Sequence, residues 1–110
     1  MLTIKRYDKD LLSGVIYGWD LVTAFEGADY YVFVFEERIG DSLPVTCRIE
    51  REKSIVAQNR GYTSGYKCEV FQVGASWRCS YMLEPKHIQN SVLLYELVEN
   101  ILETHKDSLA

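Results

Sequence analysis

Residues 66–83, YKCEVFQVGASWRCSYML, decide the fold class that this sequence predicts. Two short runs rich in aromatic residues flank Gly74 and Ala75. We expect these two residues to form the loop of a β-hairpin, because Gly74 can supply the positive φ of a type II′ turn. Val70 then pairs with Cys79, and side chains alternate between two faces. The less polar face carries Tyr66, Cys68, Val70, Gln72, Trp77, Cys79, Tyr81 and Leu83, and the other carries Lys67, Glu69, Phe71, Arg78, Ser80 and Met82. One face of the hairpin is therefore predicted to pack on a core.

The segment from Lys86 to Lys106 follows the hairpin and has the spacing of an amphipathic helix. Pro85 suits a first helical turn, where its missing N–H removes no hydrogen bond. Residues placed at intervals of about 100° gather one apolar stripe. The stripe contains Ile88, Leu94, Tyr95, Val98, Ile101 and Leu102. A helix of about 20 residues is about 30 Å long, enough to lie across a sheet.

Earlier alternating runs predict further strands at residues 2–6, 15–25, 30–39 and 45–50, with an uncertain short element at 54–57. Residues 15–25 also fit helical spacing, but Gly14 and Gly18 would each cost a helix about 1 kcal/mol, so we expect a strand. That strand would carry Val15, Tyr17, Trp19, Leu21, Thr23 and Phe25 on one face.

Residues 31–35, YVFVF, are apolar on both faces of the predicted strand. Such strands lie inside sheets that are covered on both sides. We therefore expect the helix to cover Phe33 or Val34 from one side and a second sheet or another subunit to cover the other. The predicted fold class is α+β: one globular domain, residues 1–110, with an antiparallel sheet of about five to seven strands and one long C-terminal helix on it. The alternative is a pleckstrin-homology-like or helix-grip architecture, which rests on overall shape alone.

Composition limits the classes of function. The chain has 110 residues, 47% of them apolar, and a formal net charge of −4. This charge argues against general affinity for nucleic acid or an anionic membrane surface, and no stretch has the length of a membrane-spanning helix. The three cysteines lack CxxC spacing and an export signal is disfavoured by Asp8 and Asp10, so we expect reduced thiols in the cytoplasm. A disulfide between Cys68 and Cys79 is the less favoured alternative.

Residues that could carry chemistry are not arranged as a known catalytic or metal site. On the predicted helix His87 and His105 would lie about 27 Å apart, so they cannot share a site, and packed or capping roles are favoured. Cys68, Cys79 and His87 lack zinc-ligand spacing. The adjacent residues Glu36 and Glu37 would point to opposite faces of a strand. The sequence therefore predicts no enzyme activity, no cofactor and no bound metal.

Two surfaces are candidates for binding a partner. The first is the loop 59–67, where Arg60, Tyr62 and Lys67 combine anchoring side chains with flexible glycines. The second is the acidic ridge, defined as Glu96, Glu99 and Glu103, on the outer side of the predicted helix. No lysine follows any of these glutamates at i+4, and like charges at i and i+4 destabilise a helix slightly. A partner with a basic surface would explain the ridge. Ordinary exposure to solvent, without any partner, explains the loop and the ridge as well.

The sequence thus predicts a small non-enzymatic interaction protein that masks or inhibits a macromolecular partner. Inhibitors, immunity-type proteins and phage anti-defence proteins have these properties. The expected partner is a protein with a basic surface, with nucleic acid and membrane disfavoured, and a homodimer is compatible with the sequence. The alternative function is a small-ligand or lipid-binding module with an apolar pocket under the C-terminal helix, lined by Trp19, Phe33 or Tyr81.

Overall fold

The computed structural model describes residues 16, 18–27, 30–52, 65–84, 86–87 and 90–110. Its strands are β1 (Trp19–Glu26), β2 (Tyr30–Glu37), β3 (Val45–Glu52), β4 (Gly65–Phe71) and β5 (Arg78–Leu83). They are followed by the helix α4 (Ser91–Thr104) and the short 3-10 helix η1 (Lys106–Ser108). The elements predicted at residues 2–6 and 54–57 lie outside the described residues.

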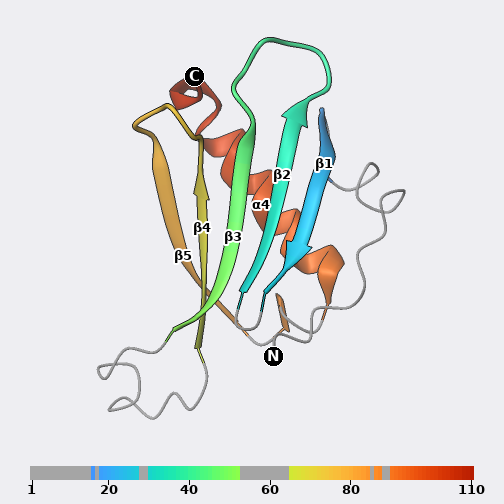
Figure 1. The fold of residues 1–110 in the computed structure, drawn as a ribbon, viewed down its shortest axis with the longest axis vertical. Coiled ribbons are helices and arrows are strands. Elements are labelled where there is room, and N and C mark those ends of the chain that lie inside the picture. The colour runs from blue at the N-terminus through green and yellow to red at the C-terminus, as the bar shows by residue number, and fades with distance from the viewer. Residues whose placement is uncertain (1–15, 17, 28–29, 53–64, 85, 88–89) are drawn as a thin grey trace.

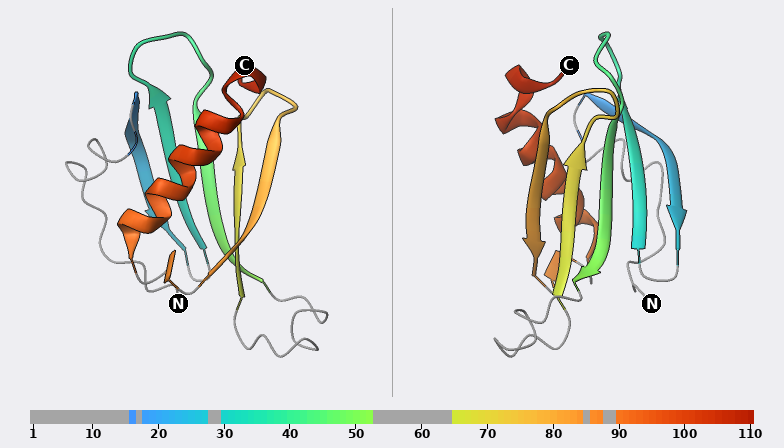
Figure 2. Two further views of the ribbon diagram at one scale, coloured as in Figure 1. Left: turned by 180° about the vertical axis from the view of Figure 1, so that it is seen from behind. Right: turned by 60° about the vertical axis from the view of Figure 1, so that its left-hand side comes forward.

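The strands form one antiparallel sheet in which each strand pairs with the next along the chain, in the order β1-β2-β3-β4-β5. Helix α4 runs diagonally across one face of this sheet, and the opposite face has no helix over it in the described part of the chain (Figure 1 and Figure 2). The predicted α+β class, with an antiparallel sheet and a C-terminal helix packed on it, is confirmed. Two layers thus enclose one core.

The predicted register of the β4–β5 hairpin is confirmed. Tyr66 pairs with Leu83, Cys68 with Tyr81 and Val70 with Cys79. The predicted type II′ turn is wrong, because Ala75 N–H donates to Gln72 O at 3.2 Å and Gly74, with φ +91°, is the third residue of that turn. A positive φ at the third position is typical of a type II turn. The register is the same because the longer loop, residues 72–77, is centred on the same pair of residues.

Strand β1 confirms the strand predicted over the second half of residues 15–25, but its alternation is broken. The pairing with β2 shifts between Leu21 and Thr23, so one extra residue lies in β1 at this bulge. An extra residue reverses the faces of all side chains beyond it. Leu21 is buried in the core, whereas Phe25 lies on the opposite face and is 49% exposed. The prediction that Trp19, Leu21, Thr23 and Phe25 share one face is therefore wrong.

Helix α4 is shorter than the predicted helix, which was expected to begin at Lys86. Asn90 has extended backbone angles and its side chain accepts a hydrogen bond from Val92 N–H at 3.0 Å, so it caps the helix at Ser91. The predicted stripe is confirmed over the described positions. Leu94, Tyr95, Val98, Ile101 and Leu102 are all buried against the sheet.

The two faces of the sheet differ in how well they are covered. On the helix side Phe33 is 2% exposed and meets the Tyr95 ring edge-on at 5.7 Å. On the other side Val34 is half-buried, while Phe25 and Met82 are 49% and 58% exposed. The expected cover by α4 is confirmed. The described strands form a single sheet, so the second sheet expected over the other face is not among them, and cover by another subunit stays a prediction.

A buried glutamine fixes the C-terminal segment against the sheet. Gln72 is 2% exposed, and its side-chain Nε2 donates to Leu43 O at 2.9 Å and to Ala110 O at 3.2 Å. Its Oε1 accepts from Ala110 N–H at 2.8 Å, and Leu43 N–H donates to Ala110 O at 2.8 Å. We call these contacts the Gln72 clamp. The clamp holds η1 and Leu109 beside the β2–β3 loop.

Candidate functional site

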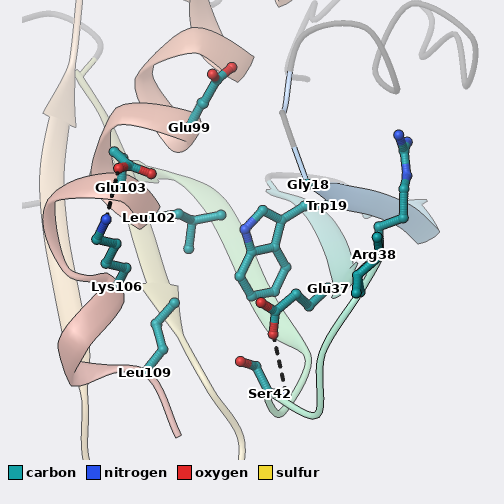
Figure 3. A pocket seen from close by; sticks show the side chains of 11 residues that line it. Gly18, Trp19, Glu37, Arg38, Ser42, Glu99, Leu102, Glu103, Lys106 and Leu109 are labelled. Atoms are coloured by element: carbon teal, nitrogen blue, oxygen red, sulfur yellow. Dashed lines mark hydrogen bonds and ion pairs between the residues drawn. The ribbon is translucent and has the colours of Figure 1, made fainter.

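A groove of about 640 Å³ lies between the C-terminal half of α4 and the neighbouring ends of β1 and β2 (Figure 3). One wall comes from the sheet and the loop after β2, and the other from α4, η1 and the residue after η1. The sheet wall contains Gly18, Trp19, Glu37, Arg38, Ile39 and Ser42, and the helix wall contains Glu99, Leu102, Glu103, Lys106 and Leu109. We call this site the acidic groove.

The sheet wall combines an aromatic ring with a carboxylate whose position is fixed. Trp19 and Glu37 are paired across β1 and β2, so their side chains leave the sheet on the same face. Glu37 Oε2 accepts a hydrogen bond from Ser42 N–H at 3.3 Å. Gly40, with φ +147°, lets the loop close over this carboxylate, because a Cβ there would lie 2.5 Å from Glu37 Oε2. The loop thus holds the Glu37 side chain at the groove.

The helix wall has an apolar floor and carboxylates along its rim. Leu102 is buried, Glu99 is half-buried and Glu103 is exposed. Lys106 Nζ lies 3.3 Å from Glu103 Oε1, an exposed i,i+3 pair that is worth little to stability but offsets one negative charge. Leu109 is brought to the same wall by η1 and the Gln72 clamp.

The charges around the acidic groove favour a cationic ligand. Its lining contains Glu37, Glu99 and Glu103 against Arg38 and Lys106. Arg38 extends away from the groove (Figure 3), and its Nη2 pairs with Asp20 Oδ1 at 2.6 Å. A guanidinium or ammonium group in the groove could donate to the carboxylates and lie against the Trp19 ring.

The structure separates the residues that the sequence singled out for partner binding. Glu99 and Glu103 line the groove, whereas Glu96 is exposed on α4 outside it. Lys67 lies on the opposite face of the sheet, with its Nζ 3.0 Å from Glu69 Oε1. Arg60 and Tyr62 lie outside the described residues. Glu99 and Glu103 therefore share one site, and Lys67 lies on a different surface.

Sequence reasoning missed Glu37, which was considered only as a neighbour of Glu36. A signal was present, because alternation along β2 places Glu37 on the same face as Phe33 and Phe35. That face is the one covered by the helix. A carboxylate that follows two core phenylalanines on the same face of a strand marks the border of the core.

The residues named for an apolar ligand pocket are in different surroundings. Trp19 lines the acidic groove, but Phe33 is 2% exposed inside the packed core. Tyr81 is 36% exposed on β5, the last strand of the described sheet. These side chains do not line one common cavity among the described residues.

The cysteines are free and fall into two environments. Cys47 and Cys68 are fully buried, with their Sγ atoms 3.4 Å apart. The hydrogen bond with Cys68, together with burial, raises the pKa of the Cys47 thiol well above its ordinary value. The third thiol, Cys79, is half-buried and lies 3.5 Å from His105 Nε2. The less favoured Cys68–Cys79 disulfide is therefore not formed.

The two histidines do not lie on one helix as predicted. His87 precedes α4, and its Nδ1 accepts from Glu84 N–H at 3.2 Å. His105 is the C-cap of α4, where its backbone N–H donates to Ile101 O at 3.1 Å and its ring lies 5.5 Å from Trp77. Across the residues that the structure describes, no three histidine, cysteine, aspartate or glutamate side chains are grouped to hold a metal ion.

Comparison of the chain with protein-family models, with curated proteins and with solved structures finds no match. Within the part of the chain that the structure describes, no helix has the length and apolar character needed to cross a membrane.

Proposed function

We propose that this protein is a small non-enzymatic interaction protein that masks or inhibits a protein partner with a basic surface, and that the acidic groove binds a lysine or arginine side chain of that partner. The observation that carries the proposal is the convergence of Trp19, Glu37 and Glu99 on one groove from opposite walls. An aromatic face beside carboxylates is a suitable receptor for a cation that has a long apolar stem.

The geometry supports an anchor within a larger interface. A stable protein–protein interface buries about 800 Å² on each partner, more than one side chain supplies. Residues that fill a pocket near the centre of an interface contribute most of its binding energy. The partner would therefore also cover the exposed flank of α4, where the more distant charge of Glu96 would mainly steer its approach.

A capture experiment tests this proposal with a matched control on the same helix. The wild-type protein, the E99K/E103K double variant and the E96K variant serve as bait in extracts of the native host. We expect the wild type and E96K to retain the same partner and E99K/E103K to lose it, because only the double variant reverses charge inside the groove. Purified partner should then bind the double variant at least about tenfold more weakly, or about 1.4 kcal/mol.

Three outcomes would contradict the groove as the binding site. The first is equal capture by all baits, and the second is a larger loss with E96K than with E99K/E103K. The third is unchanged dissociation with Glu37→Gln, which removes the fixed carboxylate but leaves the surface of α4 intact. Truncation of Arg60 and Tyr62 to alanine tests the loop as the competing anchor, because faster dissociation there would move the site away from the groove.

A second candidate function is favoured by the size of the groove. Its volume of about 640 Å³ falls within the range of small-molecule sites, so a free cationic metabolite could occupy it. This candidate predicts saturable binding of a small arginine-like or polyamine cation, followed by the fluorescence of Trp19 in a Trp77→Phe background. An arginine octapeptide binding far more tightly than the free cation would favour the protein partner instead.

A further inference from the structure

A thiol and an imidazole meet at the β5 edge of the sheet, whereas the acidic groove lies on the side of β1 and β2. Cys79 lies on β5, and its Sγ is 3.5 Å from Nε2 of His105. The His105 backbone is fixed as the C-cap of α4, and its ring lies against Trp77, with ring centroids 5.5 Å apart. The contact is therefore held from both the sheet and the helix.

Cys79 differs from the other two cysteines in the atoms that surround it. Cys47 and Cys68 are 0% exposed and contact each other, and Cys47 is kept protonated by its raised pKa. Cys79 is only half-buried. A hydrogen bond with Cys79 also raises the pKa of Tyr81, so the Tyr81 hydroxyl stays protonated beside the sulfur. The thiol of this partly exposed residue thus has an imidazole and a hydroxyl next to it.

We propose that Cys79 and His105 form a nucleophilic thiol site that reacts with small disulfides and becomes covalently modified by them. This proposal does not depend on the acidic groove. A thiol next to an imidazole is the arrangement that activates cysteine nucleophiles, because the base removes the proton as sulfur attacks. His105 would act as a neutral imidazole with its proton on Nδ1, leaving Nε2 to accept.

The exchange reaction balances without a further reagent. Sγ of Cys79 attacks one sulfur of a disulfide R–S–S–R while His105 Nε2 takes the thiol proton. A new Sγ–S bond forms and the original S–S bond breaks. The leaving thiolate then takes the proton from His105 and departs as R–SH. Cys79 is oxidised to a mixed disulfide and one sulfur of the reagent is reduced.

The test measures how fast each cysteine reacts, with the other two as internal references. The full chain is treated with 2-hydroxyethyl disulfide or with iodoacetamide, quenched in acid and mapped by mass spectrometry. The same reactions are run on the chain unfolded in urea. We expect Cys79 to react at least about tenfold faster in the folded protein than in the unfolded chain. This factor is smaller than the rate increase of about 10²–10⁴ that a positioned base typically provides. Cys47 and Cys68 should react far more slowly when folded.

Variants separate activation by His105 from simple exposure. His105→Gln should reduce the Cys79 rate to the value in the unfolded chain or below it, whereas the matched control His87→Gln should leave the rate unchanged. A folded-to-unfolded ratio below tenfold for Cys79, or equal rates in the wild type and His105→Gln, would overturn the proposal. If His105→Gln does not fold, as shown by rapid labelling of Cys47 and Cys68, the ratio measured for the wild type decides the matter.

Discussion

Replacing Gln72 with leucine removes the Gln72 clamp while keeping a side chain of similar size in the core. Gln72 makes three hydrogen bonds to backbone groups of Leu43 and Ala110, at 2.9, 3.2 and 2.8 Å. Gln72 is 2% exposed, and its partners lie in two separate segments, at Ala110 and in the β2–β3 loop.

The expected loss follows from these bonds. Each intramolecular hydrogen bond contributes about 1 kcal/mol net, so three contribute about 3 kcal/mol. Burial of the leucine offsets part of this, and the backbone of Ala110 can regain water when it detaches. We therefore expect Gln72→Leu to lower the free energy of unfolding by about 2–3 kcal/mol, a large share of the 5–15 kcal/mol typical of a domain.

Urea unfolding followed by tryptophan fluorescence measures this change, with Ser76→Ala as an exposed control in the same loop. The control should stay within about 0.5 kcal/mol of the wild type. Gln72→Leu should also weaken binding of an arginine octapeptide to the acidic groove, since Leu109 is part of its lining. A free energy of unfolding within about 0.5 kcal/mol of the wild type for Gln72→Leu would refute the reasoning.

Three further predictions concern stability. The pKa of Cys47 is raised in the folded state, so the stability that its protonated thiol contributes is fully present below the ordinary pKa of about 9.0 and is lost as pH rises above it. Above that pH the free energy of unfolding should fall by up to about 1.4 kcal/mol per pH unit in the wild type and less steeply in Cys47→Ala. Equal slopes for the two proteins in urea titrations at several pH values would contradict this. Asn90→Ala should cost about 0.5–2 kcal/mol by loss of the helix cap, measured against Asn100→Ala on the exposed side of α4. Gly74→Ala should cost about 1–2 kcal/mol because an L side chain is strained at φ +91°, and an unchanged urea midpoint would argue against the type II turn.

Local patterns in the sequence determined much of the sheet and the helix. The loop at Gly74 and Ala75 and the alternation of side chains together set the β4–β5 register, since a shift of one residue would have mixed the two faces. The stripe through Leu94, Val98 and Ile101 likewise identified the face of the helix that packs on the sheet. These patterns are readable because burial repeats with the period of the element.

Other features depended on single residues whose effect is not periodic. The bulge between Leu21 and Thr23 reversed the faces to which the side chains after it point in β1. No local pattern in the sequence marks where a strand accommodates an extra residue. The Asn90 cap shortened the helix, although the segment from Lys86 onward has a helical pattern. Propensity identifies such elements but places their ends poorly.

The sequence by itself determined that Glu99 and Glu103 stand on the polar side of a helix, and it identified Trp19 as a large side chain that could line a pocket. Only the tertiary structure decided that these side chains share a groove with Glu37, because that requires the diagonal course of α4, which places its C-terminal half opposite the ends of β1 and β2. The contact of Cys79 with His105 has the same origin, as 26 residues of chain separate them. Contacts between distant residues depend on how the layers pack, and packing is set by the whole core rather than by any one segment.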